Sequence, residues 1–150
     1  GFNALLSLRL EKSFGIWSAE FTQGYTPGMT GMDRWIDWNK DSFVGKKAAV
    51  SERDGNGPTH KLITMEVEAI DADASGFEPI WANGEKIGFV TSGGYGHTIG
   101  KSLAMGLVRK EYINLGQDLS IHVVGVERKA KVIAASPYDP EGKAMRILKR

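Results

Sequence analysis

The chain has 150 residues, 41% of them hydrophobic, and a formal net charge of +1. It can therefore bury a core, and it has no overall field that would attract nucleic acid or an anionic membrane. The absence of cysteine excludes disulfides, thiolate metal sites and a cysteine nucleophile, and fits a reducing compartment. No apolar run approaches the roughly 18 residues of a spanning helix, and no signal peptide is visible. Because the first residues look like the inside of a folded element, we expect a fragment of a longer protein.

The first predicted element is a helix within residues 2–14. Apolar residues at 2, 6, 10 and 14 recur at a spacing that keeps them on one helical face. Arg9 lies among them, and two interpretations stay open. It either pairs with a neighbouring carboxylate, as buried arginines usually do, or it contacts an anion. Trp17 follows in a second apolar patch.

The next segment combines two tryptophans with charged residues. Side chains of different character alternate roughly along residues 33–38, which predicts a short strand. Arg34 and Trp35 offer a stacking platform for a flat heterocycle, although ordinary core and rim roles are the alternative. Ser42 is the expected N-cap of a short helix through Val50. The sequence Gly-Asn-Gly-Pro at 55–58 then predicts a domain boundary.

After this boundary the hydrophobic period becomes two, which indicates strands. The predicted strands are 61–70, 87–90, 102–108, 119–123 and 126–135. Asn83-Gly84 predicts a tight hairpin, and residues 91–101 are expected to be a glycine-rich connection. Five or six short strands at this spacing favour an antiparallel barrel or sandwich. The expected fold class is therefore mainly β, α+β overall.

Two motifs suggest chemistry that their context does not support. Gly100-Lys101-Ser102 resembles the end of a phosphate-binding loop, but Tyr95 stands where that motif needs glycine, and a strand is expected where it needs a helix. The three histidines are scattered without metal-ligand spacing, so no metal site is predicted. His97 is the only one that we would test for a role.

Several stretches together resemble the C-terminal portion of the glycine cleavage T-protein family. They are Ser7–Lys12, Thr26–Pro27, Phe43–Ala48, Ile87–Gly93 and Lys101–Val108, in matching order and spacing over nearly the whole chain. The resemblance implies that residues 1–57 are the end of a folate-binding domain. It also implies that residues 58–150 form the family's C-terminal Greek-key-type β-barrel.

Within the family, the sequence is more similar to the folate-binding half of dimethylglycine and sarcosine dehydrogenases. Leu5-Leu6 replaces the Arg-Asp pair of the aminomethyltransferases. The resemblance implies a flavin-dependent N-methyl amine dehydrogenase that passes a one-carbon unit to tetrahydrofolate, with FAD in an upstream half. A fragment of a glycine cleavage aminomethyltransferase and a non-catalytic module with the same barrel are the alternatives.

The resemblance also implies where the site residues lie. The family's catalytic residues fall upstream, so no residue here is catalytic, and the isolated fragment is expected to be inactive. The candidate folate contacts are Arg34, Trp35, Arg9 and Trp17. Arg34 aligns with an aromatic residue of the family, and a guanidinium suits the carboxylates of a folate glutamate tail.

The expected partners are folate, the amine substrate and upstream domains of the same chain, without nucleic acid or membrane. The expected location is cytoplasmic in a bacterium or the mitochondrial matrix in a eukaryote.

Overall fold

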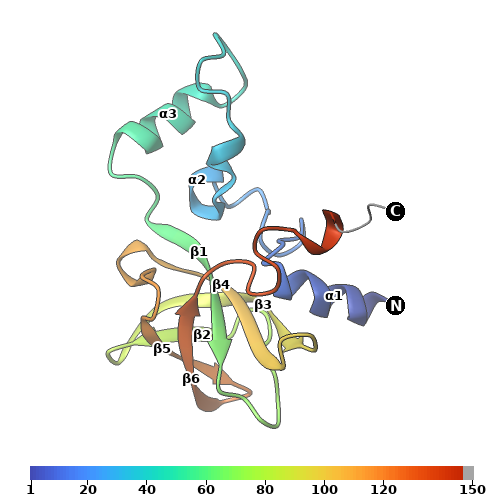
Figure 1. The fold of residues 1–150 in the computed structure, drawn as a ribbon. Coiled ribbons are helices and arrows are strands. Elements are labelled where there is room, and N and C mark those ends of the chain that lie inside the picture. Colours follow the sequence, from blue (N-terminus) through green and yellow to red (C-terminus); the bar gives the residue numbers. More distant parts are fainter. Residues whose placement is uncertain (147–150) are drawn as a thin grey trace.

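The computed structural model describes residues 1–146 as a closed antiparallel barrel with a helical N-terminal region (Figure 1). The barrel strands are β1 (His60–Val67), β2 (Pro79–Ala82), β3 (Glu85–Gly96), β4 (Lys101–Arg109), β5 (Asp118–Val123) and β6 (Val126–Ile133). Their order around the barrel is β1-β4-β3-β2-β5-β6. Strands β2, β3 and β4 form a meander with β1 beside β4, which is a Greek-key arrangement. The prediction of a mainly β, Greek-key-type barrel is confirmed. The predicted barrel domain also includes residues 147–150, which lie outside the described residues.

The helices occupy the N-terminal third of the chain and two short later turns. They are α1 (Phe2–Glu11), α2 (Pro27–Thr30), η1 (Met32–Trp35), α3 (Lys46–Asp54), η2 (Lys110–Tyr112) and η3 (Ala144–Arg146). Helix α1 lies beside the barrel near β3 and β4, whereas residues 22–57 extend away from one end of the barrel (Figure 1). We call residues 22–57 the arm. Among the described residues, no helix is long and apolar enough to cross a membrane.

The core follows the alternation along the strands. Inward-facing residues of all six strands form one buried cluster: Ile63, Met65, Val67, Ile80, Ala82, Ile87, Val90, Ala104, Val108, Leu119, Ile121, Val123, Ala130 and Val132. A second cluster joins Leu10 of α1 to Leu103 and Met105 of β4. Residues 102–108 are therefore buried without interruption, because the barrel core covers one face of β4 and α1 covers part of the other.

The predicted hairpin at Asn83-Gly84 is confirmed. Asn83 has φ 52° and Gly84 has φ 76°, the left-handed values that a primed two-residue turn requires. A second hairpin turn at Gly125, which has φ 80°, joins β5 to β6.

The prediction that residues 91–101 form a connection was wrong. Strand β3 continues through Gly96, and only residues 97–100 turn before β4. A bulge between Val90 and Ser92 shifts the register, and pairing with β4 then continues to Gly96 opposite Lys101. The glycines serve close packing, since a Cβ at Gly93 would lie 2.0 Å from the carbonyl oxygen of Ala74.

Two predictions in the arm were wrong. Residues 33–38 are not a strand: Met32–Trp35 is a 3-10 helix. Within residues 1–146 no strand pairs with this segment, and the backbone bonds locally, from Ile36 N to Asp33 O at 3.1 Å. Ser42 does not cap α3, which begins at Lys46 after Gly45 in the left-handed conformation at φ 87°.

Helix α1 is confirmed, but its predicted apolar face is buried only near its end. Leu10 is 1% exposed, whereas Phe2 is 70% and Phe14 is 57% exposed. The last turn of α1 contacts the barrel, and the first turn extends past it.

Candidate functional site

A buried ion-pair network lies where α1, the following loop and β3 meet. Arg9 Nη1 lies 3.3 Å from Glu20 Oε2, and Arg9 Nη2 donates to Ser92 Oγ at 2.6 Å. Ser92 Oγ in turn donates to Glu20 Oε1 at 2.5 Å. Arg9 is 8% exposed and Glu20 is fully buried, so this pair is shielded from solvent. Of the two interpretations for Arg9, the structure shows the carboxylate pair.

The network fixes the loop that carries Trp17. Glu20 Oε2 accepts a hydrogen bond from the backbone N–H of Ile16 at 2.9 Å, and Arg9 Nη1 donates to the carbonyl of Phe14 at 3.0 Å. Trp17 follows directly and is 83% exposed. It contacts Phe21 edge-on, with ring centroids 6.3 Å apart. Arg9 therefore holds the backbone beside Trp17, although its own guanidinium points into the interior.

A second buried carboxylate connects α1 to the turn between β3 and β4. Glu11 is 1% exposed, and its Oε1 accepts from the backbone N–H groups of Thr98 at 2.6 Å and Ile99 at 3.1 Å. The turn that resembles a phosphate-binding loop therefore has two amides already bonded to a side chain. Lys101 is also engaged, through an ion pair with Glu66 at 2.7 Å. This geometry supports the structural interpretation of the turn.

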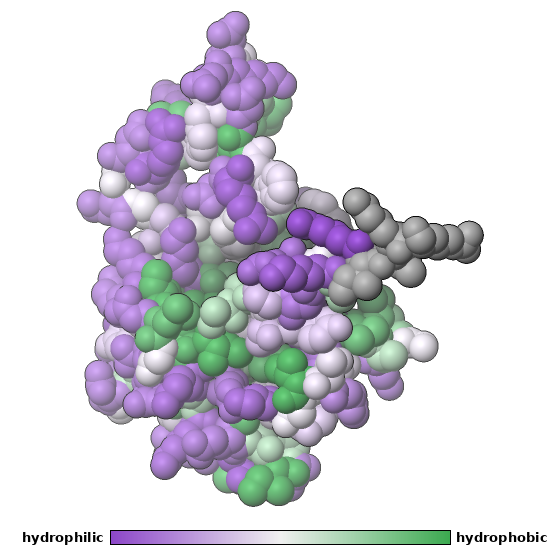
Figure 2. Space-filling view, viewed as in Figure 1, coloured by the Kyte–Doolittle hydropathy of each residue, from purple (hydrophilic) through white to green (hydrophobic). Residues whose placement is uncertain are grey.

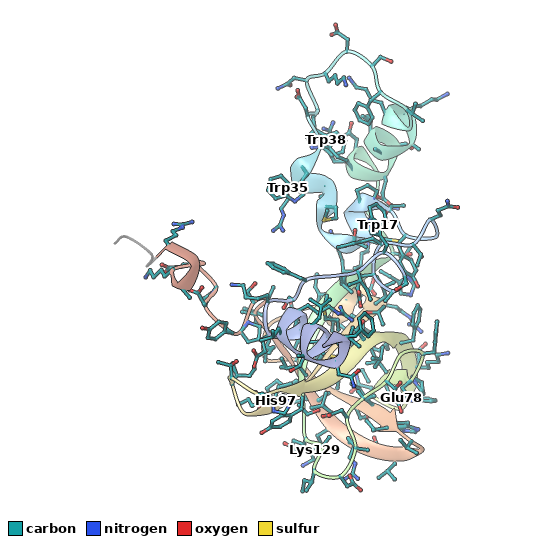
Figure 3. The ribbon with its side chains drawn as sticks, turned by 90° about the vertical axis from the view of Figure 1, so that its right-hand side faces the viewer. Trp17, Trp35, Trp38, Glu78, His97 and Lys129 are labelled. Atoms are coloured by element: carbon teal, nitrogen blue, oxygen red, sulfur yellow. The ribbon has the colours of Figure 1, made fainter. Side chains whose placement is uncertain are left out.

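The arm carries two arginine and tryptophan pairs. The Arg34 guanidinium lies 5.4 Å from the centroid of Trp35, and Arg53 lies 4.4 Å from that of Trp38. Trp35 is 73% exposed and presents a free aromatic surface beside a cation. Figure 3 shows Trp35 and Trp38 on the arm and Trp17 closer to the barrel.

The four sequence-predicted contacts are thus arranged in two groups. Arg34 and Trp35 adjoin each other on the arm, and Arg9 supports the loop of Trp17 at the barrel. None of these four residues lines the small pocket in the arm or the open groove on the barrel. The small pocket in the arm has a volume of about 40 Å³ and lies beside Trp38, between α2 and α3. No cluster of three or more metal-ligating side chains occurs in this described part of the chain.

Sequence reasoning missed an open groove of about 980 Å³ on the outer face of β1, β6, β5 and β2. Its floor includes Trp81 stacked on His122, with ring centroids 5.3 Å apart. Pairing across the strands places Lys131 beside Glu66 and Asp118. The alternation along each strand predicts which residues face outward, but only the strand register reveals that charges of opposite sign lie side by side.

Two exposed arginines each lower the pKa of a neighbouring carboxylate. A hydrogen bond from Arg109 lowers the pKa of Glu85 below its ordinary value, and the Coulombic attraction of the guanidinium acts in the same direction. A hydrogen bond from Arg53 likewise lowers the pKa of Asp54. These pairs are on the surface and define no reactive group.

This arrangement is a closed Greek-key barrel with a helical extension and a buried ion-pair network at their junction. The sequence pattern of the glycine cleavage T-protein C-terminal barrel domain matches residues 60–139, and the chain belongs to this family. The predicted resemblance to the family is confirmed.

The chain is similar both to dimethylglycine dehydrogenases and to aminomethyltransferases. The chain is 34% identical over 133 residues to mitochondrial dimethylglycine dehydrogenase of Rattus norvegicus, a match that covers 89% of this chain and 16% of that protein. It is 30% identical over 142 residues to an aminomethyltransferase of Desulfitobacterium hafniense, covering 95% of this chain and 38% of that protein. The crystal structure of glycine cleavage system aminomethyltransferase T from Bartonella henselae has the same fold, with a TM-score of 0.86 at 24% identity, covering 93% of this chain and 39% of that one. The chain thus spans less than half of the length of each of these proteins.

Proposed function

We propose that this chain is the C-terminal, folate-binding portion of an enzyme that passes a one-carbon unit to tetrahydrofolate. The observation that carries the proposal is the family match over residues 60–139, together with similarity to enzymes that extend well beyond this chain. Tetrahydrofolate supplies the atoms that accept the one-carbon unit. The residues here bind and orient it, and the reacting groups belong to other parts of the enzyme.

The exposed side chains at the arm fit one wall of a folate site. Trp35 offers a stacking surface for a pterin or benzoyl ring, and Arg34 offers a fork of donors for a carboxylate of the glutamate tail. Trp17 adds a second exposed aromatic surface nearer to the barrel. Arg9 acts indirectly in this proposal, since its two terminal nitrogens already bond to Glu20 and Ser92. The upstream folate-binding domain provides the opposite wall.

Of the enzymes with this domain, we favour a flavin-dependent dehydrogenase of the dimethylglycine or sarcosine type. In this proposal FAD binds to an upstream half, and an N-methyl amine is the substrate. The support is Leu5-Leu6 in place of the Arg-Asp pair, and 34% identity to a dimethylglycine dehydrogenase. The aminomethyltransferase function is the second candidate, supported by 30% identity over a longer stretch.

The boundary between the folate-binding tail and the barrel, at residues 57 and 58, also stays a proposal. Helix α1 belongs to the first part by sequence but packs on the barrel through Leu10. The two parts are therefore expected to unfold together.

The test is calorimetry with tetrahydrofolate on this chain and on the longer enzyme that contains it. We expect weak binding and no turnover for this chain, because it supplies one wall only, and tight binding for the enzyme. In the enzyme, Arg34→Ala is expected to weaken folate binding by about 1.5–3 kcal/mol, as for loss of a charged hydrogen bond. Lys40→Ala, elsewhere on the arm, is the matched control. Tight binding by this chain alone, or unchanged affinity in the Arg34 variant, would contradict the proposed site.

A further inference from the structure

The bulge in strand β3 changes the direction of one side chain, Ser92. Val90, two residues earlier, has its side chain in the barrel core. Ser92 pairs with Met105 of β4, which packs against Leu10 of α1 on the outer side of the barrel. In a regular strand, residues two apart point to the same side, so Ser92 would share the core face with Val90. The extra residue of the bulge, Thr91, turns Ser92 toward α1 instead.

The Ser92 hydroxyl bridges the two members of the buried ion pair. It accepts a hydrogen bond from Arg9 Nη2 at 2.6 Å and donates one to Glu20 Oε1 at 2.5 Å. A hydroxyl group is both a donor and an acceptor, so it serves a cation and an anion at the same time. Because Ser92 is only 6% exposed, these bonds are shielded from solvent. Ser92 therefore ties both charges to a strand of the barrel.

The two charged side chains extend this attachment to the loop of Trp17. Glu20 Oε2 accepts from the backbone N–H of Ile16 at 2.9 Å, and Arg9 Nη1 donates to the carbonyl of Phe14 at 3.0 Å. Apolar packing holds the loop only weakly, since Phe14 is 57% and Trp17 is 83% exposed. Where the arm joins the barrel, Figure 2 likewise shows mainly hydrophilic side chains, with apolar surface lower, on the barrel. The hydrogen bonds therefore set the position of the loop.

We propose that Ser92 is a positioning residue for the folate site, because it holds the loop of Trp17 in place through Arg9 and Glu20. The inference rests on the function proposed above, in which Trp17 is one aromatic surface of that site. Trp17 lies at the height where the arm meets the barrel (Figure 3), whereas Ser92 is buried and acts only through the two charged side chains. A ring that is already held in position loses less conformational freedom when a ligand stacks on it, so binding is tighter.

The first experiment measures the loop itself, by hydrogen exchange of the Ile16 amide in this chain. Ser92→Ala is expected to accelerate this exchange by about tenfold, because Glu20 loses the bond that holds it in place. Ser102→Ala is the matched control. Ser102 is also a buried strand serine, 4% exposed, but its hydroxyl donates to Asp73 at 2.6 Å instead of joining the ion pair. Exchange at Ile16 should be unchanged in this control.

The second experiment measures tetrahydrofolate affinity by calorimetry on the longer enzyme that contains this chain. Ser92→Ala is expected to weaken binding by about two- to tenfold, because the Trp17 ring must then be immobilised on binding. Ser102→Ala should leave the affinity unchanged. In a Trp17→Ala background, Ser92→Ala should cause no further loss, because its effect passes through the missing ring. Circular dichroism checks that each variant folds. Ser92→Cys, with a weaker donor and acceptor, should lie between serine and alanine in both experiments.

The outcomes separate the positioning role of Ser92 from the proposed folate site. Unchanged exchange at Ile16 in Ser92→Ala would refute the positioning role. A double variant that binds clearly more weakly than Trp17→Ala alone would show that Ser92 acts by another route, and would also overturn the proposal. Accelerated exchange at Ile16 together with unchanged affinity in Trp17→Ala would refute the folate contact of Trp17 itself, and with it any role of Ser92 in binding.

Discussion

Arg9 and Glu20 form a buried ion pair, with Nη1 of the arginine 3.3 Å from Oε2 of the glutamate and exposures of 8% and 0%. Ser92 of β3 bonds to both side chains, so α1, the Trp17 loop and the barrel share one polar network. Because each buried charge depends on its partner, the network determines how firmly the N-terminal region is attached to the barrel.

Glu20→Ala is predicted to lower the free energy of unfolding by about 3–5 kcal/mol, because Arg9 would remain buried without its counter-charge. Urea denaturation followed by circular dichroism measures the loss. The matched control is Glu85→Ala, whose exposed pair with Arg109 is screened by solvent, so its loss is expected to change the free energy of unfolding far less. Equal losses for the two variants would show that burial of the pair does not matter.

Glu11→Ala is predicted to loosen the β3–β4 turn. The amides of Thr98 and Ile99 would lose their shared acceptor, at a cost of about 1–3 kcal/mol. Hydrogen exchange at these two amides should accelerate in the variant. Glu11→Gln keeps one oxygen acceptor and is expected to retain part of the protection. Unchanged exchange in the alanine variant would mean that the turn holds its conformation by itself.

Gly93→Ala is predicted to destabilise the fold by about 3 kcal/mol or more, since the added Cβ would lie 2.0 Å from the carbonyl oxygen of Ala74. Gly116→Ala is the comparison. That position has φ 82° and nothing within 4 Å of the added Cβ, so only conformational strain of about 1–2 kcal/mol is expected. Thermal and urea unfolding give both values, and a smaller loss at Gly93 than at Gly116 would refute the packing argument.

The pH prediction concerns the Glu85–Arg109 pair. Its hydrogen bond lowers the pKa of Glu85 from the ordinary 4.5, so the folded state favours the ionised carboxylate. The pair's contribution to stability is therefore present above pH 4.5 and is lost as the pH falls through the lowered value. NMR titration of the Glu85 carboxyl carbon should show a midpoint below 4.5, and Arg109→Ala should raise it. A midpoint that does not change in the variant would contradict the assignment.

The sequence determined those features that depend on neighbours along the chain. Alternation predicted the inward faces of the barrel strands, and Asn83-Gly84 predicted its hairpin, because side-chain direction and left-handed φ values are local properties. Dispersed family motifs predicted the barrel family. Arg34 and Trp35 needed only adjacency to be recognised as a stacking pair, and their contact with folate stays a prediction.

The tertiary structure decided what depends on distant contacts. Residues 91–96 form a strand because β4 pairs with them and Gly93 admits Ala74. Residues 33–38 do not, because no strand in the described part of the chain pairs with them. The partner of Arg9 could not be selected from sequence, since Glu20 and Ser92 are 11 and 83 residues away. The packing of α1 against β3 brings these residues together and buries the pair, so that removal of either partner leaves an unpaired buried charge.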